Sequence, residues 1–377
     1  MTDKNIYDNK VLNLYEELET DLLALIITNL QKYENIESMS RVEFRRAIKN
    51  EGRKIYKEAL KETTKMNTKR RKALNKLFEE NVIDEVEKKY DEFNVGRKQK
   101  KIINNNIKLT DNNLRKLSKE ISFDVQDKMV SAMGNMYRNV VLADEEFGNA
   151  FKRVAKAITE SGLTYTDKAG RNRSIEATVR QDLLYRINET NREIYKEVGE
   201  KLGLNGVQLN ITPNCRDSHQ VINGQVFTNE EWKKYEYLTH DYNCQHIAEP
   251  VDIDIQGNVY TQSQIDFANN RTVMYNGDEI SYYDATQKQR ALERAIRNAK
   301  KNLVVAEKTN INVSQAKKVL NNTWQRMRDF INETGLIRDY DREFYAGYNW
   351  FWHYIKNVLL LTCKDSIIRQ ENVVKKS

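Results

Sequence analysis

Side chains that can bind metals or act in acid–base chemistry gather in one stretch of this chain. The stretch is residues 213–250, bounded by the only two prolines, and it holds most of the cysteines and histidines of the chain: Cys215, His219, His240, Cys244 and His246. Apart from His240, these residues have the spacings C-x3-H and C-x-H. Two cysteines and two histidines are the four ligands that a closed tetrahedral zinc site needs. The sequence therefore indicates zinc as a candidate cofactor of this cluster.

Two other interpretations of the cluster stay open. In the first, Cys215 and Cys244 are small buried hydrophobic residues, and the histidines are hydrogen-bonded anchors of an irregular region without a cofactor. In the second, His219, His240 and His246 hold a hydrolytic metal, and the chain is a metal-dependent nuclease or transferase. No phosphate-binding loop, paired-carboxylate site or nucleophile–base motif accompanies the cluster in the sequence. That absence favours a structural role over an enzyme.

Short strands are predicted around the cluster. Apolar residues alternate over residues 207–211, as in a half-buried strand, and this strand leads into the cysteine–histidine stretch. Asn223-Gly224 between apolar residues predicts a two-residue hairpin that pairs the residues on either side of it. Two more strands are expected over residues 251–260, and a second hairpin at the Asn-Gly pair 276–277.

Basic side chains spaced along one predicted helix could bind anions. Asp284 and Gln287 form a capping signal, and basic side chains follow at three- and four-residue steps: Arg290, Arg294, Arg297 and Lys301. That spacing places them on one side of a helix, where they can bind the phosphates of duplex DNA without reading its sequence. The alternative is that these cations pair with acidic residues of this chain or of a partner.

The composition favours long helices, because the 377 residues include only two prolines. Apolar periodicity predicts helices over residues 8–33, 40–60, 68–90, 111–160 and 175–202. Ser40 and Ser174 are expected to cap two of them, and Gly203 to end the last. Residues 96–101 are predicted to form a basic loop, and a helix from Ser314 to Gly335 is predicted to pair with the basic helix.

The predicted fold is therefore α+β and mostly α. Four regions are expected: helical residues 1–161, an α+β domain with a small antiparallel sheet at 162–283, a basic helical hairpin at 284–343, and an apolar tail at 344–377. The apolar run of the tail, 350–363, is too short and too polar to span a bilayer, so it is expected to dock on protein. A net charge of +7 favours an anionic partner. Three cysteines without a signal peptide indicate synthesis in a reducing cytoplasm.

Four motifs occur in an order and spacing that resemble one family. They are C-R-D-S-H-Q-V-I-N-G-Q-V-F, N-C-Q-H, Y-D-A-T-Q-K-Q-R-A-L-E-R-A-I-R and W-Q-R-M-R-D-F-I-N-E-T-G-L-I-R-D-Y-D-R-E. From about residue 5 to residue 344 the chain resembles the tailed-bacteriophage minor capsid protein 2 family, which is related to the Mu F-like head morphogenesis proteins. The matching positions are Arg216, Ser218, His219, Gly224, Asn243, Cys244 and His246. Gln245 departs from the family, which usually has arginine there.

The resemblance implies a virion protein at the portal vertex inside the head, made in the cytoplasm of the bacterial host. Its expected partners are the portal protein and other head proteins, bound through the helical N-terminal region, and duplex DNA, bound without sequence specificity. Exit from the head with the DNA is a further expectation. No established enzymatic activity comes with the family, and stable membrane insertion is not expected.

Overall fold

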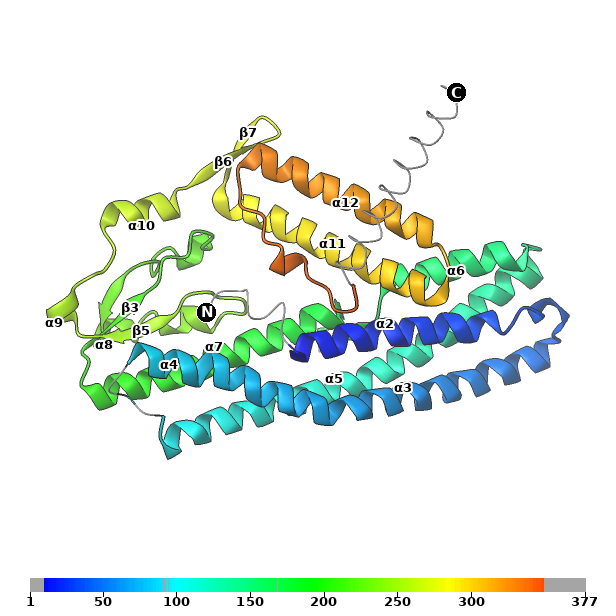
Figure 1. The fold of residues 1–377 in the computed structure, drawn as a ribbon, viewed down its shortest axis with the longest axis horizontal. Helices are drawn as coiled ribbons and strands as arrows, with labels where there is room; N and C mark the ends of the chain where they lie inside the picture. The colour runs from blue at the N-terminus through cyan, green and yellow to red at the C-terminus, as the bar shows by residue number, and fades with distance from the viewer. Residues whose placement is uncertain (1–9, 91–92, 94, 168, 349–377) are drawn as a thin grey trace, which may run out of the picture.

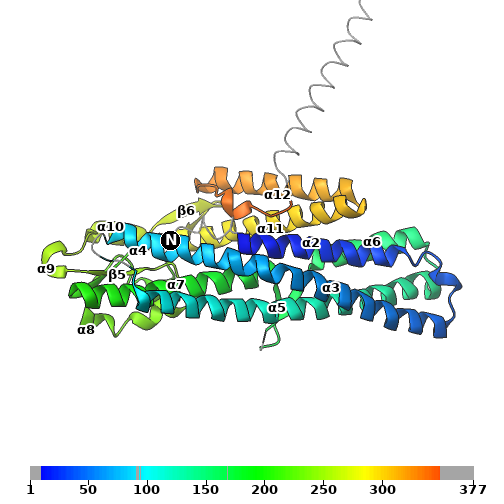
Figure 2. The ribbon, with the colours of Figure 1, turned by 60° about the horizontal axis from the view of Figure 1, so that its bottom comes forward.

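A long bundle of helices dominates the protein (Figure 1). The structure is a computed structural model, and it describes residues 10–348 apart from 91–92, 94 and 168. A three-stranded sheet lies at one end of the bundle, and a helical hairpin lies along one side (Figure 2). The predicted class, α+β and mostly α, is confirmed. None of the described helices is long and apolar enough to cross a membrane. The apolar run predicted at 350–363 lies outside the described residues.

Five long helices of the bundle share one hydrophobic core. They are α2 (Lys10–Gln31), α3 (Arg41–Phe78), α5 (Arg97–Tyr137), α6 (Phe147–Ser161) and α7 (Ile175–Leu202). Their apolar stripes meet in side chains without exposed surface, such as Leu12, Leu74, Val125 and Val179. α7, which follows the boundary expected after residue 161, belongs to this core as well.

The second and third predicted helices form one continuous helix, so the predicted break between them is wrong. α3 passes through a π-helical turn, η2 (Glu79–Ile83), directly into α4 (Asp84–Lys89). The capping box of Ser40 starts this helix as predicted. Gly52 lies where α5 comes close, because a Cβ atom there would lie 3.0 Å from the side chain of Val130.

The basic segment 96–101 is the start of α5 rather than the predicted loop. The Gly96 amide donates a hydrogen bond to the Gln99 side chain at 3.0 Å, which caps the helix and lets it begin before the first strong apolar repeat. The single helix predicted beyond residue 111 is also wrong. A π-helical turn, η3 (Arg138–Leu142), and Asp144, with φ of +52°, separate α5 from α6.

Both ends of α7 are as predicted. The hairpin of β1 (Thr164–Thr166) and β2 (Asn172–Ser174) precedes the helix. The Ser174 hydroxyl accepts a hydrogen bond from the Ala177 amide at 3.2 Å. The helix ends at Gly203, which has a left-handed φ of +68°.

Three strands form an antiparallel sheet in the order β4-β3-β5: β3 (Gly206–Leu209), β4 (Val226–Thr228) and β5 (Ala248–Val251). The predicted strand before Pro213 is confirmed. The hairpin predicted at Asn223-Gly224 is wrong, because β4 pairs with β3 and not with the residues just before Asn223. A type I′ turn needs positive φ at both central residues. Gly224 has φ of +68°, whereas Asn223 is not among the residues with positive φ.

Short helices follow β5 where two strands are predicted. α9 (Ile253–Gln256) and α10 (Gln262–Asn269) occupy most of this region, so the strands predicted over 251–260 are wrong beyond the end of β5. The second Asn-Gly hairpin is confirmed. It joins β6 (Thr272–Tyr275) to β7 (Asp278–Ser281) through two residues with positive φ.

The predicted helical hairpin is confirmed and consists of α11 (Tyr282–Thr309) and α12 (Val313–Thr334). α11 starts earlier than predicted, because Ser281 is its N-cap and accepts a hydrogen bond from the Asp284 amide at 3.0 Å. α12 ends at Gly335, as predicted. α11 packs against α2 and α6, which places the hairpin along the bundle (Figures 1 and 2).

A buried ion pair connects three helices of the bundle. Arg70 of α3 has no exposed surface, and its Nε and Nη2 lie 3.0 and 2.8 Å from Asp111 Oδ1 of α5. Arg70 Nη1 donates to the hydroxyl of Tyr15 of α2 at 3.3 Å, and that hydroxyl donates to the Leu114 carbonyl at 2.8 Å. Buried charges of this kind are tolerated only while their partners are present.

We expect Asp111→Ala to lower the free energy of unfolding by about 3–5 kcal/mol, because it leaves the Arg70 charge buried without its carboxylate. Glu62→Ala is the matched control, since Glu62 pairs with Lys65 on the partly exposed surface of α3. Its loss should change the free energy of unfolding by no more than about 1 kcal/mol. Denaturant titrations measure both variants. Equal, small effects would contradict a structural role for the buried pair.

Candidate functional site

Two loops at one end of the sheet carry the cysteines and histidines. β3 runs into a turn that holds Cys215 and then into a short 3-10 helix, η4 (Asp217–His219). A second 3-10 helix, η5 (Glu236–His240), precedes the segment that holds Cys244 and His246 and that leads into β5. Because β3 and β5 are paired, the two loops leave the same end of the sheet.

Asparagine side chains hold these loops against the sheet and the bundle. Asn188 Nδ2 of α7 donates to the Cys244 carbonyl at 3.1 Å. Asn210, directly after β3, accepts a hydrogen bond from the Ile247 amide at 2.7 Å. Asn243 has a left-handed φ of +63°, which asparagine tolerates better than most residues, and so turns the chain into the cluster.

Three of the four predicted metal ligands converge. Cys244 Sγ lies 3.6 Å from His219 Nδ1 and 3.5 Å from His246 Nδ1. One ligand atom from each of the three residues lies within 4.8 Å of the others, and all three residues are buried. Cys215 Sγ instead lies 3.6 Å from Nε2 of His246, on the other nitrogen of the ring. The structure therefore brings together a triad of His219, Cys244 and His246. The fourth predicted ligand, Cys215, lies on the opposite side of the His246 ring.

The outer nitrogens of both imidazoles face oxygen acceptors. His219 Nε2 lies 3.1 Å from Asp241 Oδ2, and His246 Nε2 lies 3.1 Å from Asn223 Oδ1. Asn223 is fully buried, and its Oδ1 also accepts a hydrogen bond from the Thr212 amide at 2.7 Å. That bond fixes which side-chain atom of Asn223 is the oxygen. The two rings are therefore held with Nδ1 toward the cysteine.

Burial favours the uncharged forms of the cluster. Removal from water raises the pKa of the Cys244 thiol, and it raises the pKa of Cys215 to about 12. The same desolvation lowers the pKa of His246 to about 4. At neutral pH these residues are therefore two thiols and a neutral imidazole. The protein environment alone does not prepare a thiolate nucleophile here.

The other predicted site residues surround the triad rather than enter it. His240 Nδ1 lies 2.9 Å from a carboxylate of α7 and is partly exposed. Arg216 Nη1 donates to Asp241 at 3.1 Å, which joins the two loops. Ser218 is exposed on η4. Gly224 has positive φ, and a Cβ atom there would come within 2.7 Å of a neighbouring side chain, so both conformation and space require glycine.

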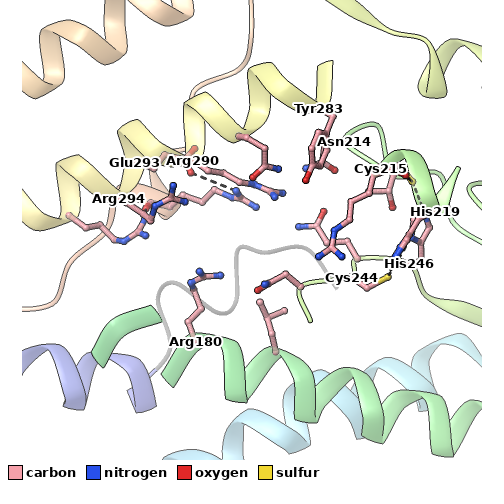
Figure 3. Close-up of a pocket in the computed structure, with 18 residues that line it drawn as sticks. Arg180, Asn214, Cys215, His219, Cys244, His246, Tyr283, Arg290, Glu293 and Arg294 are labelled. Carbon is pink, nitrogen blue, oxygen red and sulfur yellow. Dashed lines mark hydrogen bonds and ion pairs between the residues drawn. The ribbon is translucent and has the colours of Figure 1, made fainter. Parts of the chain in front are cut away.

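The triad forms one end of a pocket that arginines line (Figure 3). Its walls come from α7, α11, η6 (Asp341–Glu343) and the two loops, and six arginines contribute to it: Arg180, Arg216, Arg290, Arg294, Arg297 and Arg342. Glu293 is the only carboxylate among the described residues that line it. Planar guanidinium groups bind phosphate and carboxylate oxygens in pairs, so the pocket is suited to an anionic ligand.

The four cations predicted to bind DNA do not form one accessible surface. Arg290 and Arg294 line the pocket, and Arg294 is exposed. Arg297 is only 3% exposed and lies 3.2 Å from a carboxylate of α7, and Lys301 is 5% exposed and lies 3.4 Å from a carboxylate of α2. Arg297 and Lys301 therefore form ion pairs within the chain, as in the alternative interpretation of these cations, because α11 is buried on that side.

Five residues assigned to the site are missing from the prediction: Asn223, Asp241, Arg180, Arg342 and Glu293. Asn223 is equally suited to a turn, and only its burial shows that it supports His246. The sequence offers one signal for Asn223 and Asp241: metal-binding imidazoles need carboxylate or amide partners, and these two side chains are close to the histidines in the sequence. Arg180 and Arg342 are far from residues 213–250 in the sequence, so only the fold places them at the site.

The fold and the site define a mostly helical protein with a cysteine–histidine module and a cationic pocket. The family model described as phage minor capsid protein 2 matches residues 5–332. The chain belongs to this family of phage minor capsid proteins, which confirms the resemblance that the motifs carry, and its role is that of a structural protein of the virion. No curated protein and no solved structure is significantly similar to it.

The carboxylate of Glu293, in the wall of the pocket, is placed to titrate near neutral pH. Burial raises the pKa of Glu293 to about 7, against the opposing effect of Arg297. Asp339 adds to the rise, and the hydrogen bond from Gln289 opposes it. Arg342 Nη1 lies 3.6 Å from its Oε2. As pH falls through about 7, Glu293 takes up a proton and the pocket loses its negative charge.

We expect sulfate, whose charge is constant in this range, to bind more tightly at about pH 6 than at about pH 8. One unit charge at short range in a partly solvated site changes affinity by roughly tenfold. In Glu293→Gln the affinity should lose most of this pH dependence and stay near the low-pH value of the parent. Calorimetric titrations at both pH values measure the effect. The same pH dependence in parent and variant would exclude Glu293 as its source.

Proposed function

We propose that this protein acts in head morphogenesis at the portal vertex, inside the phage head, and contacts packaged DNA through the arginine-lined pocket. The observation that carries the DNA contact is the set of arginines around one pocket, of which Arg290 and Arg294 keep accessible surface. Membership of a minor capsid family supports the place in the head. The net charge of +7 also favours an anionic partner such as DNA. Synthesis is expected in the cytoplasm of the bacterial host.

The proposed contacts are to phosphates rather than to bases. Arg290 and Arg294 are one helical turn apart on α11, and both keep part of their surface accessible while lining the pocket. Phosphate contacts release condensed counterions and carry no sequence information. Binding to duplex DNA is therefore expected to be sequence-independent and weak, with a Kd of about 10⁻⁴ to 10⁻⁶ M.

Replacing Arg290 and Arg294 by glutamine is expected to weaken DNA binding. The slope of log K against log salt should fall in magnitude by about 0.9 for each phosphate that the variant no longer neutralises. Arg297 and Lys301 stay unchanged in this variant, because both are buried in ion pairs and their removal would disturb the fold. Fluorescence anisotropy titrations at several salt concentrations measure the slope.

The matched control replaces Lys57 and Lys61, which are exposed on α3, by glutamine. It removes the same charge from a part of the chain that does not line the pocket. The control should keep most of the affinity of the parent. An equal decrease of the slope in both variants would show that the attraction comes from net charge and would overturn the assignment to the pocket.

The second candidate is a metal-dependent nuclease or transferase. One observation favours it: His219, Cys244 and His246 line the same pocket as the arginines. Incubation of the protein with duplex DNA and Mg²⁺, Mn²⁺ or Zn²⁺ distinguishes the two candidates. The leading proposal expects intact DNA. Cleavage that His219→Ala abolishes in a folded protein would support the enzyme.

The portal contact is proposed at the end of the bundle away from the sheet. There η1 (Ile36–Ser38) contacts η3, and two apolar side chains, Val42 and Leu142, are 67% and 62% exposed. Exposed apolar side chains can mark a protein interface. Deletion of residues 1–95 is not a suitable test, because α2 and α3 are part of the main core.

We expect the double variant Val42→Ser, Leu142→Ser to lose most of the portal protein that co-purifies with the parent, because it removes apolar surface without touching the core. The control is Ile255→Ser with Val259→Ser, which changes exposed apolar residues in and just after α9. Figure 1 shows α9 at the opposite end of the molecule. Quantitative co-purification measures both. Equal portal recovery from the two variants would exclude this end as the interface.

A further inference from the structure

The hydrogen bonds of two buried histidines leave a place for a cation beside Cys244. Asp241 Oδ2 faces Nε2 of His219, and Asn223 Oδ1 faces Nε2 of His246. Both oxygens are acceptors, so in the neutral rings each Nε2 carries the proton and each Nδ1 presents a lone pair. Both lone pairs lie within 3.6 Å of one sulfur. A thiol has a single proton and can satisfy only one of them.

We propose that a zinc ion occupies this place, bound by His219 Nδ1, His246 Nδ1 and Cys244 Sγ. Zinc–sulfur and zinc–nitrogen bonds at a tetrahedral angle place the sulfur and nitrogen atoms about 3.6 Å apart. The two sulfur–nitrogen distances in the structure are 3.6 and 3.5 Å. Both sulfur–nitrogen separations therefore match those that zinc requires, and all three ligand atoms lie within 4.8 Å of one another.

The surroundings of the triad are those of a metal site. A histidine that binds a metal through one nitrogen usually donates its other N–H to a carboxylate, a carbonyl or water, which fixes the orientation of the ring. Asp241 holds His219 in this way, and the buried Asn223 amide holds His246. Asn223 is held in turn by the Thr212 amide and by Asn269, whose Oδ1 accepts from Asn223 Nδ2 at 2.7 Å.

The donor atoms select the kind of metal. One thiolate and two imidazoles are soft and borderline ligands, which suit zinc, whereas magnesium and calcium require oxygen ligands. A magnesium-dependent reaction at the triad is therefore not expected.

The fourth coordination position is proposed to be open toward the pocket. Cys215 lies at Nε2 of His246 and not at Nδ1, so it is not a ligand in this arrangement. Three protein ligands with one open position are the arrangement in which zinc binds water or a further ligand. All three ligands line the arginine-lined pocket, so an anion bound by the arginines can reach this position.

The test measures metal content and ligand identity in the full-length protein. Protein purified without chelators from zinc-supplemented cells should contain roughly one equivalent of zinc, measured by inductively coupled plasma mass spectrometry. Replacement of zinc by cobalt(II) should give a thiolate-to-cobalt charge-transfer band. Cys244→Ser should lose this band, whereas Cys215→Ser should keep both the band and the metal. Inorganic phosphate should shift the cobalt d–d bands of the parent protein.

Each result either supports or overturns the proposal. Less than about a third of an equivalent of zinc in the folded parent protein would overturn the metal site and leave a metal-free cysteine–histidine pair. Loss of metal or of the band in Cys215→Ser, with an unchanged circular dichroism spectrum, would overturn the open fourth position. His240→Ala is the control for a histidine of the same segment outside the triad, and it should keep the full zinc content. The change of salt slope expected for the Arg290 and Arg294 variant does not depend on this result.

Discussion

The site depends on how α11 docks on the helical bundle, because α11 and α7 form two walls of the same pocket. Buried charges lie at this contact: Lys301 lies 3.4 Å from Glu19 of α2, and Arg297 lies 3.2 Å from Glu176 of α7. Val305 of α11 belongs to the core of the bundle and supplies apolar attraction. Breaking a buried pair costs about 3–5 kcal/mol, so a shift of α11 that separates these charges is strongly disfavoured. The ion pairs thus fix the position of the arginines that face the pocket.

The parts of the fold that the sequence predicted correctly are those with local causes. The caps at Ser40 and Ser174 and the left-handed Gly203 involve residues within one helical turn, so the chain near them is sufficient to predict them. Several of the wrong predictions concern where a helix starts or continues. α3 continues into α4, and the basic segment 96–101 is helical. Packing across the bundle decides such cases, and packing has no local signature.

The site was predictable only as far as its residues are close in sequence. The cysteine–histidine stretch was visible because its members lie on two loops that paired strands bring together. The role of Asn223 was hidden, because Asn-Gly predicts a hairpin and the burial of its amide overrides that preference here. The cations of α11 were ambiguous for a different reason. A helical spacing places Arg290 and Lys301 on a helix, but it does not reveal which side of that helix another segment will cover.

The geometry also links the proposed zinc site to the arginines. A zinc ion with one thiolate and two neutral imidazoles carries a net charge of about +1, which adds to the charge of the guanidinium groups around it. Charges in a partly buried pocket interact more strongly than in water. A bound anion would therefore increase the affinity for the metal, and the metal would increase the affinity for the anion by the same factor. Under the proposed function, this coupling means that metal bound before packaging would strengthen the binding of DNA phosphates in the pocket.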